Sequence, residues 1–484
     1  MAHGITVSER SSSISVPAQL ESSIPVVLGT APINMSRLGT VPVNVPILVK
    51  SFSEAVEAVG YSENFASYSL CEFMDSHFRL YGLSPVILIN VLDPSTHKAA
   101  VAATDKPVSS GVVKLSEEGI LITSIVVKSA DGTTTFMKNT DYTAAFDSAG
   151  FVVITRKASG TIPANAITLK VSYEKLDPSA VDSADIIGGL DSVTGKQTGL
   201  ELLNQVYPRF GLVPGLVVAP GYSSDPIVAA VMVAKAGNIN GHFKALALTD
   251  IPSGTGGVSL YTDAPVWKAN NNYTASQQVV TWPKVTFKGK QYHLSTQVAG
   301  TIGETAEANG GIPYVSPSNK SLRADGAVIA NGSEVFLGPD QAAYLNAQGI
   351  LTALNFVGGW KTWGNHTGAF PTATEAKDSF IAIRNMFNWI ANSIVLTYWK
   401  KVDDPLSKRL IETVTDDINI WLNGLTSSGA LLGGRVEFNQ SENATADLLK
   451  GFSRFHLYLT PPGPAQEMHF ILEYDPSYLG STFA

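Results

Sequence analysis

Short apolar runs alternate with helical patterns in the first hundred residues, and few folds accommodate that alternation. The runs cover residues 24–32, 44–51 and 84–93 and are rich in Val and Ile. Between them, residues 53–59 and 66–80 carry the spacing of helices with one apolar face. Strands that are apolar along their whole length are typical of a sheet that is buried on both faces. We therefore expect βα units on a mostly buried sheet.

The same pattern resumes further along the chain. Residues 216–220 are a buried strand candidate, and "FKALALTDI" at 243–251 supplies the next strand. Between these strands, Asp225 is a favoured helix N-cap residue and Pro226 suits the first turn of a helix. Residues 252–345 are rich in Gly, Asn and Thr and predict shorter strands.

A stretch of different amino-acid composition interrupts the α/β pattern. Residues 97–175 are rich in Thr, Ser and Val, and they contain strand-like runs such as "ILITSIVVKS" and "FVVITRKASG". Helical periodicity is absent from this stretch, which lies between Pro94 and Pro178. We interpret it as a small all-β module inserted into the α/β domain.

Two amphipathic helices and three strand candidates follow residue 366. The first helix is expected after the capping pattern of Thr372 and Glu375, and the second is expected to start at Asp404 and Pro405. Their apolar stripes are Phe380, Ile383, Phe387, Ile390 and Ile394 in the first helix, and Leu410, Val414, Ile418, Trp421 and Leu425 in the second. The strand candidates are residues 434–439, 452–460 and 467–474, with a short helix at 443–450.

Each end of the chain carries an alternating strand pattern without an obvious partner. In residues 467–474, the side chains of one face are Met468, Phe470, Leu472 and Tyr474. Near the start, two short alternating pieces contain Ile5, Val7, Ile14 and Val16, with no turn signal that would close them into a hairpin. Strands of this kind are suited to pairing with another chain.

The chain is thus predicted to be a multidomain α+β protein. Its expected parts are an extended arm at 1–22, a discontinuous α/β core domain at 23–96 and 176–365, the inserted β module at 97–175, a C-terminal domain at 366–466, and a terminal strand or arm at 467–484.

Composition excludes several classes of protein. A net charge of −8 and a pI near 5.5 argue against nucleic acid or an anionic membrane as a partner, because either requires a basic face. The single cysteine, Cys71, excludes an internal disulfide framework and a cysteine-cluster metal site, and we expect it to be a small buried residue. The chain shows no secretion signal and no apolar stretch of 18 residues, so we expect a cytoplasmic protein without membrane insertion.

No local pattern supports catalysis. The segment "GGLDSVTGKQTG" at 188–199 resembles a phosphate-binding loop, but Leu190 stands where the motif needs Gly and Gln197 where it needs Ser or Thr. We interpret it as a plain turn. The histidines form no HxxxH or HxH pair, and there is no GxSxG elbow. We therefore expect no catalytic residue, metal or cofactor, although carboxylates that only the fold brings together would escape notice.

The segment "NFVGGWKTWGNHT" at 355–367 concentrates aromatic residues and glycines. The simpler interpretation is a tightly packed turn in which Trp360 and Trp363 bury a large area and Gly364 allows a close backbone approach. The functional alternative is a platform on which a sugar stacks. An α/β enzyme or carbohydrate-binding protein that uses this cluster is accordingly the second functional hypothesis.

Several segments, in their shared order, resemble the tail sheath proteins of contractile phages and of R-type bacteriocins. The matching pieces are "HGITVSE", "SIPVVLGTAP", "NVPILVKSFSEAVEAVG", "IIGGLDSVTGKQTGLELL", "PGLVVAPGYS", "YVSPSNKSL", "GGWKTWGNHT" and "NATADLLKGFSRFHLYLTPPGPAQEMHFILEYD". They cover most of the chain except residues 97–175 and parts of 252–310. The inserted module departs from the smallest members of the family and is similar to outward-facing decoration in longer ones.

The resemblance implies a structural polymer and not an enzyme. Family members stack as six-fold rings around an inner tube and contract when the baseplate triggers them, which drives the tube through a bacterial envelope. The implied partners are other copies of the chain, the tail tube protein, and the baseplate and tail terminator proteins. The implied location is a virion or bacteriocin particle that is assembled in the host cytoplasm. A sheath of an extracellular injection system shares this mechanism and remains an open alternative.

The resemblance also implies roles for particular segments. Arms at both ends would add strands to a small sheet in a neighbouring subunit's C-terminal domain. Hinges for these arms would lie at Pro17, and at Pro461, Pro462 and Gly463. The helix at 443–450 would correspond to the family's attachment helix, so that its domain faces the inner tube. Asp447, Lys450 and Arg454 are the candidate tube contacts, although a solvated helix face explains each of them equally well.

Overall fold

The computed structural model describes residues 20–147, 149–254 and 256–478. Within this part of the chain, a six-stranded sheet forms the centre of the largest hydrophobic core. Neighbouring strands are parallel except for the pair β2 and β3. In spatial order the strands are β15 (Gln278–Thr281), β14 (Leu246–Asp250), β13 (Leu216–Val218), β1 (Pro25–Gly29), β3 (Val86–Asn90) and β2 (Ile47–Val49). The predicted buried α/β sheet is thereby confirmed.

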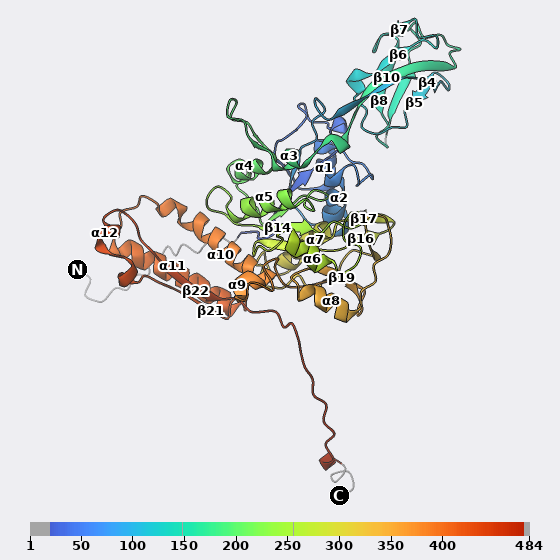
Figure 1. Cartoon of the computed structure of the whole chain (residues 1–484). Coiled ribbons are helices and arrows are strands. Elements are labelled where there is room, and N and C mark those ends of the chain that lie inside the picture. Colours follow the sequence, from blue (N-terminus) through green and yellow to red (C-terminus); the bar gives the residue numbers. More distant parts are fainter. Residues whose placement is uncertain (1–19, 148, 255, 479–484) are drawn as a thin grey trace, which may run out of the picture.

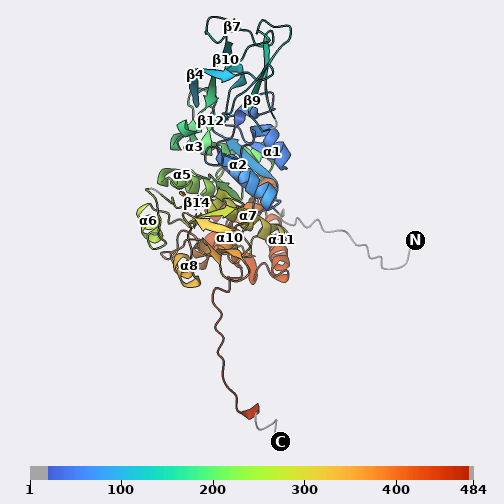
Figure 2. The same cartoon turned by 90° about the vertical axis from the view of Figure 1, so that its right-hand side faces the viewer.

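Helices cover both faces of this sheet. In Figures 1 and 2, α5 (Pro226–Gly237) and α7 (Leu294–Glu307) lie on opposite sides of β14. The predicted cap of α5 is confirmed, because Oδ1 of Asp225 accepts a hydrogen bond from the backbone N–H of Ile227 at 2.8 Å. Further helices of this region are α1 (Phe52–Val59), α2 (Ser69–Met74), η2 (Asp75–Leu80), α3 (Ser183–Ile187), α4 (Leu203–Phe210), α6 (Ala264–Asn270) and α8 (Pro339–Asn346), together with the short 3-10 helices η1 (Ile33–Met35), η4 (Pro178–Ala180) and η5 (Gly199–Leu202).

The helix expected at 66–80 differs from the prediction in two ways. It begins only at Ser69, where the side chains and backbones of Thr30 and Ser69 exchange hydrogen bonds of 3.2 and 3.3 Å. This contact fixes the start of α2 against the end of β1. From Asp75 onward the helix widens into the π-helical segment η2, a form that periodicity alone does not distinguish from an α-helix.

Residues 98–176 form two antiparallel sheets around a core of their own. The long strands β4 (Lys98–Pro107) and β10 (Thr168–Leu176) pair with each other and lead into and out of this part, which extends away from the core sheet in Figure 1. The remaining strands are β5 (Val112–Lys114), β6 (Val126–Lys128), β7 (Thr135–Phe136), β8 (Tyr142–Phe146) and β9 (Val152–Arg156). Val127 and Val171 are fully buried within it.

The segment that resembles a phosphate-binding loop is a β-hairpin. Its strands are β11 (Gly189–Leu190) and β12 (Gln197–Thr198), which confirms the interpretation as a turn. Gly188 is required at its base, because it has a φ of +64° and a Cβ atom there would lie 2.0 Å from the carbonyl oxygen of Thr198. Further small sheets consist of β16 (Lys284–Phe287), β17 (Lys290–Tyr292) and β18 (Gly326–Val328), and of β19 (Thr352–Asn355) and β20 (Trp360–Trp363).

The C-terminal region packs two long helices on a β-hairpin. The helices are α10 (Ile381–Tyr398) and α11 (Lys408–Ser427), and the strands are β21 (Gly433–Glu437) and β22 (His456–Thr460). Two short helices, α9 (Ala376–Ser379) and α12 (Thr445–Leu448), flank them. Trp389 and Trp421 meet in the core of this region, with ring centroids 5.6 Å apart.

Both long helices begin later than predicted. The predicted cap of Thr372 and Glu375 does not form, because α9 begins at Ala376 with Glu375 as N-cap and no side-chain capping bond. Phe380 is extended, since the adjacent backbone bridges to residues 365–367, and α9 therefore ends after one turn. The second helix does not start at Asp404 and Pro405. Its N-cap is Ser407, whose Oγ accepts from the N–H of Leu410 at 3.2 Å. Asp403, at a φ of +68°, holds the preceding chain out of helical geometry.

Amide side chains join α10 to the core domain. Asn388 and Gln277 exchange two hydrogen bonds of 2.8 and 3.0 Å between their side chains. One turn further, Asn392 bonds the backbone N–H and C=O of Lys244 at 2.9 and 2.8 Å. α10 is therefore buried beyond the predicted apolar stripe, since its polar side faces the core domain.

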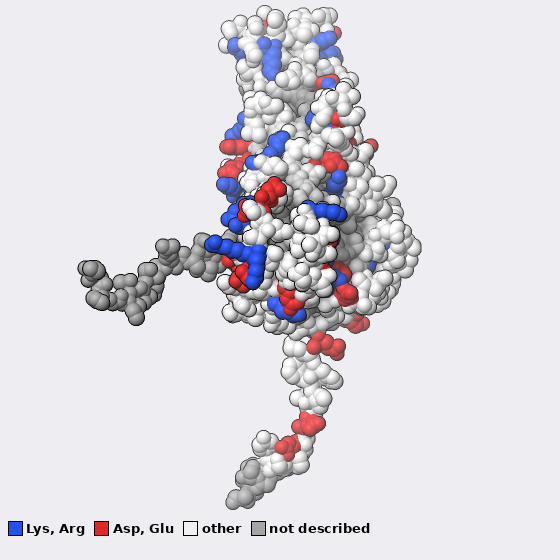
Figure 3. All heavy atoms as spheres, turned by 90° about the vertical axis from the view of Figure 1, so that its left-hand side faces the viewer, with Lys and Arg blue, Asp and Glu red and all other residues white. Residues whose placement is uncertain are grey.

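No helix in residues 20–147, 149–254 and 256–478 is long and apolar enough to cross a membrane. The same residues contain no cluster of three His, Cys, Asp or Glu side chains suited to a metal ion. Basic and acidic groups are interspersed on the face seen in Figure 3. Cys71 is fully buried, as predicted.

Candidate functional site

The C-terminal segment leaves the body of the molecule and carries exposed apolar side chains. Beyond β22 the chain extends away from both cores in Figures 1 and 2. The four predicted side chains of one face, Met468, Phe470, Leu472 and Tyr474, are 71%, 78%, 96% and 80% exposed. No strand within the described residues pairs with them. Exposed apolar groups in this number are typical of a contact surface, and the contact role of these four residues stays a prediction.

The linker that leads to this segment is anchored at its base. Pro461 is buried, Pro462 is half-buried and Gly463 is exposed. Residues 462–467 form one wall of an open cavity of about 640 Å³, and Trp363 and Tyr314 line it from the core domain. The chain thus stays beside its own subunit through residue 467, beyond Gly463. The hinge at Pro461, Pro462 and Gly463 stays a prediction.

The tryptophan and glycine cluster forms the hairpin β19–β20. Trp360 packs on the main core, and Trp363 is half-buried beside the linker. Gly364 has a φ of +133°, and a Cβ atom there would lie 2.8 Å from Cα of Leu351. The close backbone approach at Gly364 fits the interpretation as a tightly packed turn, whereas Trp360 and Trp363 are only half-buried.

Two of the three candidate tube contacts bind each other. Nη1 of Arg454 lies 2.8 Å from Oδ2 of Asp447 and donates to the carbonyl oxygen of Glu442 at 2.9 Å. Asn443, which is fully buried, bonds the backbone N–H and C=O of Arg454 at 2.7 and 2.9 Å. Lys450 is exposed. The structure thus brings Asp447 and Arg454 together on a loop that Asn443 fixes.

The N-terminal arm residues Ile5, Val7, Ile14 and Val16, and the hinge residue Pro17, lie outside the described residues. The first residue described is Leu20, which packs against the core of the C-terminal domain. Nε1 of Trp389 donates a hydrogen bond to its carbonyl oxygen at 2.8 Å.

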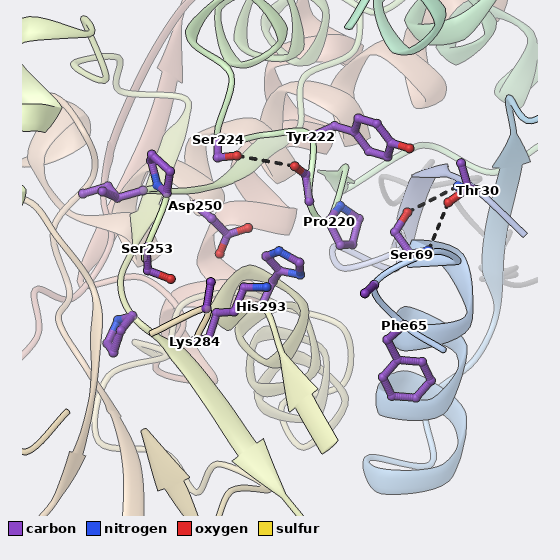
Figure 4. A pocket seen from close by; sticks show the side chains of 16 residues that line it. Thr30, Phe65, Ser69, Pro220, Tyr222, Ser224, Asp250, Ser253, Lys284 and His293 are labelled. Atoms are coloured by element: carbon purple, nitrogen blue, oxygen red, sulfur yellow. Dashed lines mark hydrogen bonds between the residues drawn. The ribbon is translucent and has the colours of Figure 1, made fainter. Parts of the chain in front are cut away.

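A cavity of about 400 Å³ opens at the carboxyl edge of the parallel sheet, between the ends of β1, β13 and β14 (Figure 4). This is where α/β enzymes bind ligands, so it is the place to test the enzyme hypothesis. Asp250 lies within it and is almost fully buried. Its two oxygens accept hydrogen bonds from Thr281 Oγ1 at 2.7 Å, Ser295 Oγ at 2.5 Å, Ser295 N–H at 3.0 Å and Ser223 Oγ at 3.2 Å.

A second buried carboxylate beside this cavity, that of Glu72, also has a partner at each of its oxygens. Oε1 of Glu72 accepts from the backbone N–H of His293 at 2.7 Å, and Oε2 lies 2.8 Å from Nδ1 of that histidine. Burial raises the pKa of Glu72, but the charge and hydrogen bonds of His293 outweigh burial and hold that pKa below its ordinary value. Asp250 and Glu72 therefore hold the first turn of α7 in place, where its backbone N–H groups favour negative charge.

Sequence analysis did not identify these carboxylates, nor the amides of α10. Glu72 and His293 are 221 positions apart, and neither lies in a motif. The sequence offers one signal for Glu72. Its neighbours are mostly apolar, and a carboxylate among residues that are expected to be buried is unusual.

No protein-family model matches the chain. It is similar to a tail sheath protein of Burkholderia phage BcepMu, with 29% identity over 490 residues that cover 99% of this chain and 97% of the relative. It is also 20% identical, over 67% of its length and 80% of the relative, to a major tail sheath protein of Serratia phage KSP20.

Solved structures share the fold. One is the sheath complex of an extracellular contractile injection system in the contracted state, with a TM-score of 0.57, 12% identity and 99% of each chain covered. Another is the helical sheath of the anti-feeding prophage in the contracted state, with a TM-score of 0.57 and 15% identity, covering 98% of this chain and 99% of the other. The likeness to these structures supports the mixed α+β, multidomain fold described above.

Proposed function

This chain is a homologue of the tail sheath proteins of contractile injection systems, and we propose that it polymerises as stacked six-fold rings around an inner tube. On triggering, the rings shorten and widen and drive the tube through a bacterial envelope. The energy is stored at assembly, as the difference between two packings of one subunit.

The extended C-terminal segment is the observation that carries this proposal. A row of exposed apolar side chains on a chain that leaves the body is costly unless a partner covers it. Main-chain pairing between copies tolerates rotation of the subunits, provided that the linker between them bends. Gly463 supplies the bend, while Pro461 and Pro462 limit the disorder of the free arm.

The parts of the chain take distinct places in the polymer. The core domain, at 23–96 and 176–365, forms the body of the sheath, and the module at 97–175 faces outward. The C-terminal domain, at 366–466, faces the tube through Asp447, Lys450 and Arg454. The arms at 1–22 and 467–484 connect neighbouring copies.

The partners follow from this arrangement: other copies of the chain, a tail tube protein, and baseplate and tail terminator proteins. The subunit binds no nucleic acid, inserts in no membrane and performs no catalysis. The absence of catalysis is supported by the two buried carboxylates, since the side-chain oxygens of Asp250 and Glu72 already accept hydrogen bonds from within the subunit. Assembly takes place in the cytoplasm of the bacterial host, and the product is a phage or bacteriocin particle.

Electron microscopy of the purified protein tests the proposal. We expect hollow tubes or sheath-like rings, and a strictly monodisperse monomer at high concentration with both ends intact would overturn the proposal. Deletion of residues 1–18 or 467–484 should leave a folded subunit that no longer polymerises.

A matched pair of variants sharpens this test. Serine at positions 468, 470, 472 and 474 should abolish polymers, because it removes the apolar face of the arm. Serine at positions 469, 471 and 473 changes the opposite face of the arm, and this variant should still form polymers. Equal effects of the two sets would contradict the strand model of the arm.

A further inference from the structure

A buried histidine of the core domain has an unsatisfied ring nitrogen. His77 is 2% exposed, and its Nδ1 is buried without a hydrogen-bond partner among the described residues. The ring stacks on that of Phe73, with centroids 5.0 Å apart, and is perpendicular to that of Phe78. Burial lowers the pKa of His77 to about 3, so the imidazole is neutral. Most buried polar atoms in proteins have a partner, so this nitrogen requires an explanation.

The backbone around His77 has an uncommon form. His77 lies in the π-helical segment η2, where the N–H of Tyr81 donates to the carbonyl oxygen of Ser76, five residues back, at 3.1 Å. Turns of this kind inside helices are rare and are frequent at functional sites. The carbonyl oxygen of His77 accepts from the N–H of Leu83 at 2.9 Å. The backbone carbonyl of His77 thus has a partner, whereas Nδ1 of its side chain has none.

His77 lines a small open cavity of about 140 Å³. Residues 23–25, residues 83–85 and the end of α7 supply most of its wall. Gly303 of α7 also lines it, and a Cβ atom there would lie 3.9 Å from Cε1 of His77, the carbon bonded to Nδ1. Sites for cofactors and other small molecules usually occupy about 300 to 1,000 Å³. The cavity therefore suits the end of one side chain, or a free molecule of similar width.

Two acidic residues line the same cavity. Glu21 and Glu307 are both exposed, and neither carboxylate forms an ion pair within the part of the chain that the structure describes. A Cβ atom at Gly311, just beyond α7, would lie 3.5 Å from Oε2 of Glu21, so this carboxylate lies beside the end of that helix. Glu307 is the last residue of α7, whose last turn carries no basic residue. The negative end of the helix dipole adds to the two carboxylates and favours a cation here.

These groups together select the chemistry of a ligand. One nitrogen of a neutral imidazole accepts a hydrogen bond, and two carboxylates attract positive charge and repel anions. The described residues contain no cluster of three His, Cys, Asp or Glu side chains that suits a metal ion. An organic cation with N–H donors satisfies all three side chains at once.

We propose that this cavity binds a guanidinium or alkylammonium group, which donates a hydrogen bond to His77 and pairs with Glu21 and Glu307. The inference goes beyond the proposed function and does not depend on it. The group has two sources, a Lys or Arg side chain of a second copy of this chain or a small free amine. Its chemistry is the same in both cases, and the experiment separates them.

Calorimetric titration of the full chain with agmatine, which carries both kinds of cationic group, tests the site. We expect agmatine to bind, and the double variant Glu21→Gln with Glu307→Gln to bind it roughly tenfold more weakly, because it loses two partly exposed ion pairs. The matched control is Glu304→Gln, which changes a carboxylate on the same helix outside the cavity and should bind as the parent does. Equal affinity in the parent and the double variant would overturn the proposal.

His77→Phe tests the contribution of the imidazole. Phenylalanine keeps an aromatic ring against Phe73 and removes the unsatisfied nitrogen, so the variant without ligand should melt at no lower temperature than the parent. The rise in melting temperature that agmatine causes in the parent should be absent from the variant. An undiminished rise would show that His77 does not contact the ligand.

Comparison of polymers with dispersed subunits identifies the source of the cation. If a second copy supplies it, polymers should take up no agmatine, and agmatine should slow their assembly. If a free amine is the ligand, polymers and dispersed subunits should bind agmatine equally well. Dispersed subunits that bind no agmatine would overturn the proposal, whether or not polymers form, and would leave the proposed function standing.

Discussion

The indole Nε1 of Trp389 donates a hydrogen bond to the backbone carbonyl of Leu20 at 2.8 Å, so the base of the N-terminal arm is fixed to the C-terminal domain. Replacement of Trp389 by Phe should keep most of the packing and remove this bond. We expect a loss of about 1 kcal/mol in the free energy of unfolding and weaker polymerisation, measured by denaturant titration and sedimentation. Trp421→Phe is the control, because Trp421 belongs to the same core and, among the residues that the structure describes, donates no hydrogen bond to Leu20. Equal polymerisation in the two variants would contradict the anchoring role.

The pair Glu72 and His293 predicts a particular response to acid. Because the pKa of Glu72 is lowered in the folded state, the unfolded state binds more protons as the solution is acidified. The stabilisation is thus fully present above the ordinary carboxyl pKa of 4.5 and is lost as the pH falls through the lower folded value. Thermal unfolding between pH 7 and pH 3 should show this decline.

Glu72→Gln should remove the same contribution at neutral pH. Breaking a buried pair costs about 3 to 5 kcal/mol, and the variant should lose part of the acid dependence of the parent. The exposed Glu334→Gln is the control and should change neither quantity. An unchanged stability and pH slope in Glu72→Gln would show that the pair does not hold α7.

The packing around Gly364 predicts that alanine substitutions at two glycines of the β19–β20 segment lower the stability of the protein by different amounts. Gly364→Ala places a Cβ atom 2.8 Å from Cα of Leu351, and the strained backbone adds about 1 to 3 kcal/mol. Gly359→Ala, at a φ of +86°, meets no atom within 4 Å and should cost less. The free energies of unfolding of the two variants decide this, and a larger cost at Gly359 would contradict the packing described.

Asp447 and Arg454 allow a test of the tube contact. The pair is partly exposed, so Arg454→Asp should lower the stability of the subunit by less than about 1 kcal/mol. Co-assembly with the tube protein should nevertheless fail, as judged by electron microscopy. If the two residues serve only each other, the exchanged double variant Asp447→Arg with Arg454→Asp will restore assembly. If they contact the tube, the double variant will remain defective.

Local patterns predicted the elements that depend on neighbours in sequence. The apolar runs at 24–32 and 84–93 became the buried strands β1 and β3 because uniform apolarity suits a sheet covered on both faces. The cap of α5 at Asp225 was also predictable, because a capping bond joins residues that are only two positions apart. The late starts of α10 and α11 were not, because backbone bridges at 365–367 and the left-handed Asp403 interrupt the helical pattern.

The sequence by itself determined that the chain has a buried α/β sheet, because periodicity and capping are short-range. The strand predicted at residues 467–474 has no regular secondary structure within the described subunit and stays a prediction. Only the tertiary structure decided how Glu72 meets His293 and how Asn388 meets Gln277. Those contacts depend on hydrogen bonds between groups that lie far apart in the chain or on different elements, and their geometry exists only once the elements have packed.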